Sequence, residues 1–184
     1  IHYWLGCALS ELGEKNKARE HWRTAAEFKG DFQEMSVRQF SEMTYYSALS
    51  WERLGQRAKA KKLFRALLKY AQALEQAPAK IDYFATSLPT MLLFEDDLPF
   101  RQQTTALFLQ AQAQLGLGNR SKSSSRRKSA PSDRSLERNW SGLTSAATRE
   151  RSGNQAQAQS LLKQVLQRDP NHALASDFLG QVQS

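Results

Sequence analysis

The 184-residue sequence contains very little of what several classes of protein need. Cys7 is the only cysteine, which excludes an internal disulfide bond and a zinc site held by thiolates. No run of about 18 apolar residues is present, so we expect no membrane-spanning helix. The signature motifs of serine hydrolases, phosphate-binding loops and zinc proteases are missing as well. These absences predict a protein that is not an enzyme and that binds no metal and no cofactor.

The abundant residues favour helices. Ala, Leu, Gln, Glu, Lys and Arg dominate, and aromatic residues, at 10%, are sufficient to build a core. We therefore expect an all-α fold, with a length that suits one domain or a short solenoid. The chain starts at Ile1 inside an apolar helical pattern, without an initiator methionine or a signal peptide. This start predicts a fragment of a longer, cytoplasmic protein.

The net charge of +8 is concentrated in one stretch. Residues 120–152 hold nine basic and three acidic residues, which account for six of the eight charges. The basic cluster Arg126, Arg127, Lys128 would suit phosphate groups, so weak nucleic-acid binding is one alternative function, although a solvated loop is the simpler interpretation. A second basic series, Arg57, Lys61, Arg65 and Lys69, recurs every four residues and indicates the solvated outer face of a helix.

One pattern of small and large residues occurs three times. Each copy has a small residue in a first helix, then a glycine, then an alanine followed four residues later by a large apolar residue. The glycine is expected to end the first helix, because it accepts the left-handed conformation. The small residues let two antiparallel helices approach closely. The copies are Gly6, Gly13, Ala18 and Trp22; Ala48, Gly55, Ala60 and Phe64; and Ala111 and Gly118, continued by Gly153, Ala158 and Leu162.

This pattern, closed by Asp169-Pro170, resembles the tetratricopeptide repeat (TPR) family over most of 1–118 and 153–184. The resemblance implies antiparallel helix hairpins in a right-handed superhelix, here with irregular repeat lengths. The units must stack, because a single hairpin cannot bury its apolar face. An ordinary helical bundle with a chance spacing of small residues is the alternative.

The irregular lengths predict two long helices and a linker within 1–118. Apolar spacing favours one helix over 33–54 and another from Gln56 to about Ala77. Prolines punctuate the linker at 78–99, in which 80–87 would form a short helix. Of the acidic residues 95–97, which alternatively suggest a cation site, Asp97 is expected to cap the helix that starts beside Pro99. The segment 80–98 also resembles the C-terminal repeat region of large bacterial proteins with a sugar-enzyme-like domain of unknown function. An accessory region of a carbohydrate-processing enzyme is therefore another alternative.

The basic, serine-rich stretch 119–153 interrupts the third unit. Gly118-Asn119 and Gly153-Asn154 are the same dipeptide, and joining Gly118 directly to Asn154 would restore a regular unit. The pattern predicts an insertion, mainly loop, followed by 154–184 as the second helix of the split unit and a capping helix. A degenerate extra repeat is the alternative, with Leu136, Trp140, Leu143 and Ala147 on part of a helix.

The family resemblance implies a non-enzymatic scaffold for protein contacts. In such proteins the first helix of each pair lines a concave groove, which here would suit an apolar or basic peptide from a partner or from another domain of the same chain. Tyr3, Tyr45 and Phe108 are expected to anchor that peptide, unless this surface only stacks hairpins. Carried onto this sequence, the groove comprises Tyr3, Cys7, Glu11, Glu42, Tyr45, Leu49, Glu52, Arg53, Phe108 and Gln112.

Overall fold

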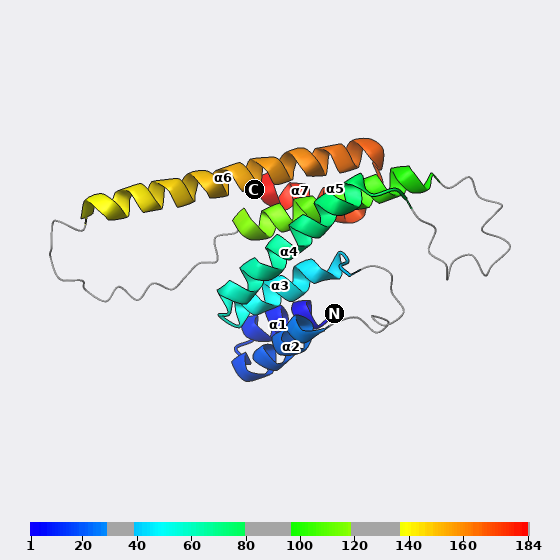
Figure 1. The fold of residues 1–184 in the computed structure, drawn as a ribbon. Coiled ribbons are helices and arrows are strands. Elements are labelled where there is room, and N and C mark those ends of the chain that lie inside the picture. Colours follow the sequence, from blue (N-terminus) through cyan, green and yellow to red (C-terminus); the bar gives the residue numbers. More distant parts are fainter. Residues whose placement is uncertain (29–38, 80–96, 119–136, 184) are drawn as a thin grey trace.

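The computed structural model describes residues 1–28, 39–79, 97–118 and 137–183, with the backbone alone for 137–151 and 183. Every regular element in these ranges is an α-helix, which confirms the predicted all-α class (Figure 1). Along the chain the helices are α1 (His2–Glu11), α2 (Lys15–Glu27), α3 (Met43–Arg53), α4 (Arg57–Gln76), α5 (Leu98–Gly118), α6 (Glu137–Arg168) and α7 (Ala173–Gln183).

The turns of the first two hairpins share one geometry. Gly13 and Gly55 have φ angles of +83° and +81°, in the left-handed region that favours glycine. The amide after each glycine donates to a carbonyl five residues back, from Glu14 to Leu9 at 2.9 Å and from Gln56 to Trp51 at 2.8 Å. This bonding defines the Schellman motif. The prediction that these two glycines end the first helix of a pair is therefore confirmed.

Small residues bring the helices together where the repeat pattern predicted. A Cβ atom on Gly6 of α1 would lie only 2.6 Å from the indole ring of Trp22 in α2. A Cβ atom on Gly116 of α5, which lies outside the predicted pattern, would come still closer to the fully buried ring of Phe64 in α4. This contact joins the second hairpin to α5. The five alanines of the pattern are also fully buried: Ala18, Ala48, Ala60, Ala111 and Ala158.

Helices α5 and α6 form the third hairpin and run antiparallel. At one end, the guanidinium of Arg168 in α6 donates to Thr104 Oγ1 at 3.1 Å and to Gln103 Oε1 at 2.9 Å, near the start of α5. At the other end, Gln155 of α6 and Gly118 of α5 line the same cavity. The part of α6 before Gln155 therefore extends past the end of α5, as the yellow ribbon in Figure 1 shows.

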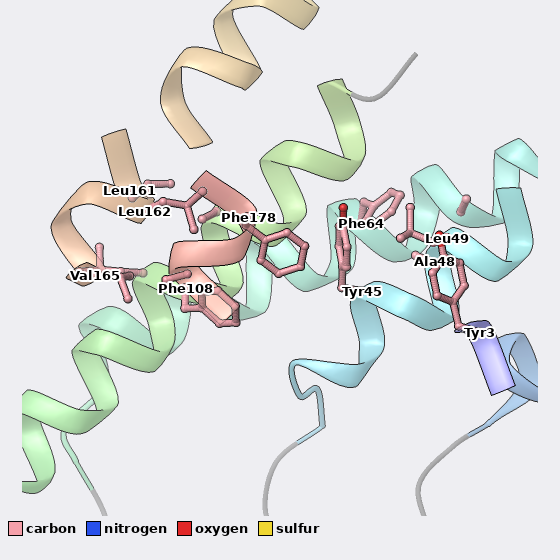
Figure 2. Close-up of a cluster of buried hydrophobic side chains, with 14 of the residues drawn as sticks. Tyr3, Tyr45, Ala48, Leu49, Phe64, Phe108, Leu161, Leu162, Val165 and Phe178 are labelled. Carbon is pink, nitrogen blue, oxygen red and sulfur yellow. The ribbon is translucent and has the colours of Figure 1, made fainter. Parts of the chain in front are cut away.

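The last helix, α7, lies against both α5 and α3. The Phe178 ring centroid is 5.9 Å from that of Phe108 in α5 and 5.2 Å from that of Tyr45 in α3 (Figure 2). His172 starts the helix, because its Nδ1 accepts a hydrogen bond from the Ala175 amide at 3.2 Å. Helix α7 thus contributes to the core that the second and third hairpins share.

Helix α3 is shorter than the predicted helix over 33–54, so that prediction is wrong at its start. Helix α3 begins at Met43, and residues 39–42 are not helical. The Met43 amide donates to Ser41 Oγ at 3.3 Å, and the Ser41 amide donates to Thr44 Oγ1 at 3.1 Å. These side-chain bonds satisfy backbone groups at the start of the helix and fix where it begins. Residues 33–38 lie outside the described residues.

The loop predicted over 119–153 is wrong from Glu137 onward, because α6 continues through Gly153 without a turn. Gly153 is not among the described glycines with positive φ. A glycine inside a helix costs only about 1 kcal/mol relative to alanine. Its neighbours Arg151, Gln155 and Ala156 are helix formers, so the helix is not interrupted. Residues 119–136 lie outside the described residues.

The linker predicted over 78–99 leads into a capped helix. Asp97 Oδ1 accepts a hydrogen bond from the Phe100 amide at 2.9 Å, which confirms Asp97 as the predicted cap of α5. Pro99 lies in the first turn, where its missing N–H is tolerated. Helix α4, which precedes the linker, matches its predicted range. Residues 80–96 lie outside the described residues, and with them the short helix predicted at 80–87 and the acidic residues 95 and 96.

Candidate partner-binding surface

The three aromatic residues predicted to anchor a peptide are buried within the chain itself. Tyr3, Tyr45 and Phe108 expose 8%, 6% and 0% of their surfaces (Figure 2). Phe178 of α7 covers Tyr45 and Phe108, and Tyr46 packs against Tyr3 with the ring centroids 5.5 Å apart. In this conformation the rings fill the core, so the prediction that they anchor a partner is wrong. Burial raises the pKa of Tyr45 far above its ordinary value.

Two further residues of the predicted groove are also buried. Gln112 is fully enclosed, and its Nε2 donates to the Glu42 carbonyl at 3.3 Å. That bond ties α5 to the residue that precedes α3. Leu49 exposes 9% of its surface and belongs to the same core. Gln112 and Leu49 therefore stabilise the contact between hairpins.

The charged groove residues remain at the surface. Glu11 and Arg53 are exposed, whereas Glu42 and Glu52 are half-buried. Burial raises the pKa of the Glu52 carboxyl, although Arg57 and Arg53 act in the opposite direction. Burial and the nearby Cys7 raise the pKa of the Tyr3 hydroxyl, whereas its hydrogen bond with the Arg53 side chain lowers that pKa. The structure thus retains the charges of the predicted groove but not its aromatic anchors.

A different surface presents apolar side chains to solvent. Ile1, Trp4, Leu5 and Leu12 expose 100%, 58%, 40% and 76% of their surfaces, and Ala8 is also exposed. At helical spacing, these five residues form one continuous line on α1 and its two ends, opposite the buried Tyr3 and Gly6. We call this line the α1 stripe. This stripe was not predicted from the sequence, although a helix with apolar residues on both faces is typically covered on both.

The α1 stripe meets α3 at two aromatic rings. The Trp4 and Tyr46 ring centroids are 5.9 Å apart, and the Trp4 and Tyr3 centroids are 5.1 Å apart. Burial raises the pKa of the Tyr46 hydroxyl, and the carboxylates of Asp177 and Glu42 raise it further. Residues of α1 and α3 therefore meet at this edge of the stripe, and Phe178 brings α7 against the neighbouring Tyr45.

The basic residues predicted on the outer face of α4 lie on that face. Arg57, Lys61, Arg65 and Lys69 are exposed, while Phe64 on the opposite side is fully buried. The cluster Arg126, Arg127, Lys128 lies outside the described residues. Nucleic-acid binding through that cluster therefore stays a prediction.

The histidine and cysteine side chains of the first hairpin contribute to its packing. No group of three His, Cys, Asp or Glu side chains there has the geometry to hold a metal ion. His2 and His21 hydrogen-bond through their Nδ1 atoms at 2.9 Å and stack, which joins α1 to α2. Cys7 is half-buried and packs against the core. Within the described ranges, no helix combines the length and apolarity that a bilayer span requires.

Two family models, both described as tetratricopeptide repeat, match the chain. One matches residues 1–32, which contain α1 and α2, and the other matches 43–77, which contain α3 and α4, and 142–172 within and just after α6. Together the matches cover just over half of the 184 residues. Comparisons with curated proteins and with solved structures found no match. With three hairpins, each built on the small-and-large pattern, the chain belongs to the tetratricopeptide repeat family.

Proposed function

We propose that this chain is a non-enzymatic scaffold that binds an amphipathic helix of a partner protein along the α1 stripe. The observation that carries the proposal is the line of exposed apolar side chains opposite the packed face of α1. Contiguous apolar surface of this kind marks interaction sites on soluble proteins. Tetratricopeptide repeats commonly serve as protein-interaction scaffolds, which supports the same function.

The shape of the stripe favours a helix as its occupant. Its five residues extend over three helical turns, or about 16 Å at 1.5 Å per residue. A partner helix with apolar residues at positions i, i+3, i+4 and i+7 would match this length. No stripe side chain carries a charge, so apolar contact would supply most of the affinity.

A selection from a library of displayed 14-residue peptides tests this function. We expect the wild-type chain to enrich amphipathic peptides, and the Leu5→Gln/Leu12→Gln variant to bind them at least tenfold more weakly, as expected from about 2 kcal/mol per buried leucine. Met43→Gln is the matched control, because Met43 exposes 49% of its surface and lines a cavity with Tyr70 and Leu109 instead of belonging to the stripe. Circular dichroism verifies the fold of each variant.

Two outcomes would overturn the proposal. Equal binding by the stripe variant and the control would place the peptide elsewhere. A wild-type dimer in light scattering that the Leu5→Gln/Leu12→Gln substitutions dissociate would identify a second copy of the chain as the occupant.

We also propose that residues 119–153 are inserted into the third hairpin. The close approach of Gln155 and Gly118 supports this arrangement, because the two ends of the segment lie near each other. The family match over 142–172 favours the alternative, a degenerate repeat whose first helix lies before Gly153. Helix α6 continues through the turn that the alternative requires, which is why we favour the insertion.

A further inference from the structure

The edge of the α1 stripe that faces α3 combines an exposed aromatic surface with negative charge. Trp4 exposes 58% of its surface, and Tyr46 packs beside it with the ring centroids 5.9 Å apart. Tyr3 contacts both rings: its ring centroid is 5.1 Å from that of Trp4 and 5.5 Å from that of Tyr46. The exposed indole therefore has a defined position.

Two carboxylates from distant parts of the chain flank Tyr46. Glu42 precedes Tyr46 by one helical turn at the start of α3. Asp177 adjoins Phe178 of α7, whose ring centroid is 5.2 Å from that of Tyr45, the neighbour of Tyr46. Both act to raise the pKa of Tyr46, in addition to the larger effect of burial. Asp177 is exposed, and neither carboxylate forms an ion pair with another described residue. The site therefore has negative charge beside an aromatic face, and no described side chain neutralises that charge in an ion pair.

We infer that Trp4, Tyr46, Glu42 and Asp177 receive a lysine or arginine side chain of the helix that binds along the α1 stripe. Aromatic faces attract ammonium and guanidinium groups within about 6 Å of the ring centroid, and carboxylates beside the ring add direct attraction. Trp4 belongs to the α1 stripe and also to this cation site, so the basic residue of the partner helix would lie beside its apolar residues. The inference rests on the proposed function and specifies the chemistry of its partner.

The selection described above tests this inference through the composition of the enriched peptides. We expect lysine or arginine at one fixed position beside the apolar series when the wild-type chain is used. With Glu42→Gln/Asp177→Asn the apolar series should persist while the basic position is lost. Glu20→Gln/Glu27→Gln, which removes the same charge from exposed positions of α2, is the control and should leave the basic position unchanged.

A binding cycle measures the effect directly. Fluorescence anisotropy would compare one enriched peptide with the same peptide in which the basic residue is glutamine. We expect the wild-type chain to bind the basic peptide about fivefold more tightly, as a cation–π contact with an exposed ion pair allows. The Glu42→Gln/Asp177→Asn variant should prefer it much less, because only the rings remain. An equal preference in the wild type and this variant would overturn the inference.

The failures of the two proposals are distinguishable. If amphipathic peptides are enriched without a basic position, the stripe binds helices and only the cation site is wrong. If no peptide is enriched, both the proposed function and the cation site are wrong. If Arg126→Ser/Arg127→Ser/Lys128→Ser strengthens peptide binding more than tenfold, the basic segment of the chain itself occupies the site, and a separate partner is overturned.

Discussion

Two glycines in helices have opposite surroundings, and this contrast predicts opposite effects of alanine. A Cβ atom on Gly116 would overlap the buried Phe64 ring, whereas nothing lies within 4 Å of one on Gly153. Gly116→Ala should lower the free energy of unfolding by about 1–3 kcal/mol despite the better helix former. Gly153→Ala should raise it by about 0.5–1 kcal/mol. Urea unfolding measures both, and a gain in stability for Gly116→Ala would contradict the tight packing of α4 on α5.

The buried phenol of Tyr45 predicts how stability depends on alkaline pH. Burial raises its pKa in the folded chain, while an unfolded chain ionises near the ordinary value of about 10. Its contribution is therefore fully present below pH 10 and is lost as the pH rises towards the folded pKa. Between pH 8 and 11, the unfolding free energy of Tyr45→Phe should fall by about 1 kcal/mol less than that of the wild type. If urea titrations show the same loss of unfolding free energy for the wild type and for Tyr45→Phe, the Tyr45 phenol is not shielded from solvent.

At the scale of elements, Arg168 holds the end of α6 on the start of α5. Besides its bonds to Thr104 and Gln103, its guanidinium stacks over the Phe100 ring, 4.2 Å from the centroid. A lysine cannot form this planar set of contacts. Arg168→Lys should therefore lower the unfolding free energy by about 1–2 kcal/mol, while Arg65→Lys on the exposed face of α4 should change it by less than about 0.5 kcal/mol. Equal effects in thermal or urea unfolding would refute the role of Arg168.

The helices that the sequence predicts well are those whose limits are set locally. Gly13 and Gly55 end helices through bonds within six residues, and Ala60 and Phe64 meet neighbours of their own repeat pattern. The start of α3 was misplaced because apolar spacing continues through 33–42. Hydrogen bonds around Ser41 outweigh that spacing.

The candidate site was less predictable, because it depends on how the superhelix closes. Tyr45 and Phe108 have the spacing of groove residues, yet Phe178 packs on both from more than 60 residues away. No local pattern contains that contact. The α1 stripe was visible in the sequence as Ile1, Leu5 and Leu12, but whether a neighbour covers these residues is set by the fold.

At the scale of the whole molecule, the insertion hypothesis makes a prediction about cooperativity. Among the described side chains, the buried residues of α6 are Ala158, Leu161, Leu162 and Val165, which all follow Gly153. Under the insertion hypothesis, joining Gly118 to Asn154 keeps these four residues and the core that they form. We expect the shortened chain to unfold cooperatively within a few degrees of the wild-type midpoint, while helicity falls by no more than the share of residues 137–153.

A matched deletion makes this test specific. Removing 119–136 alone should leave both the midpoint and the helical content close to those of the wild type, since it takes away no described helix. If 142–153 instead forms the first helix of a fourth repeat, it must bury apolar surface against a neighbour, because a hairpin is not stable alone. Deleting 119–153 would then lower the midpoint by well over 5 °C, whereas deleting 119–136 would not. Calorimetry on the two shortened chains separates the alternatives. An insertion predicts similar midpoints for both chains, whereas a fourth repeat predicts a lower midpoint for the chain that lacks 119–153.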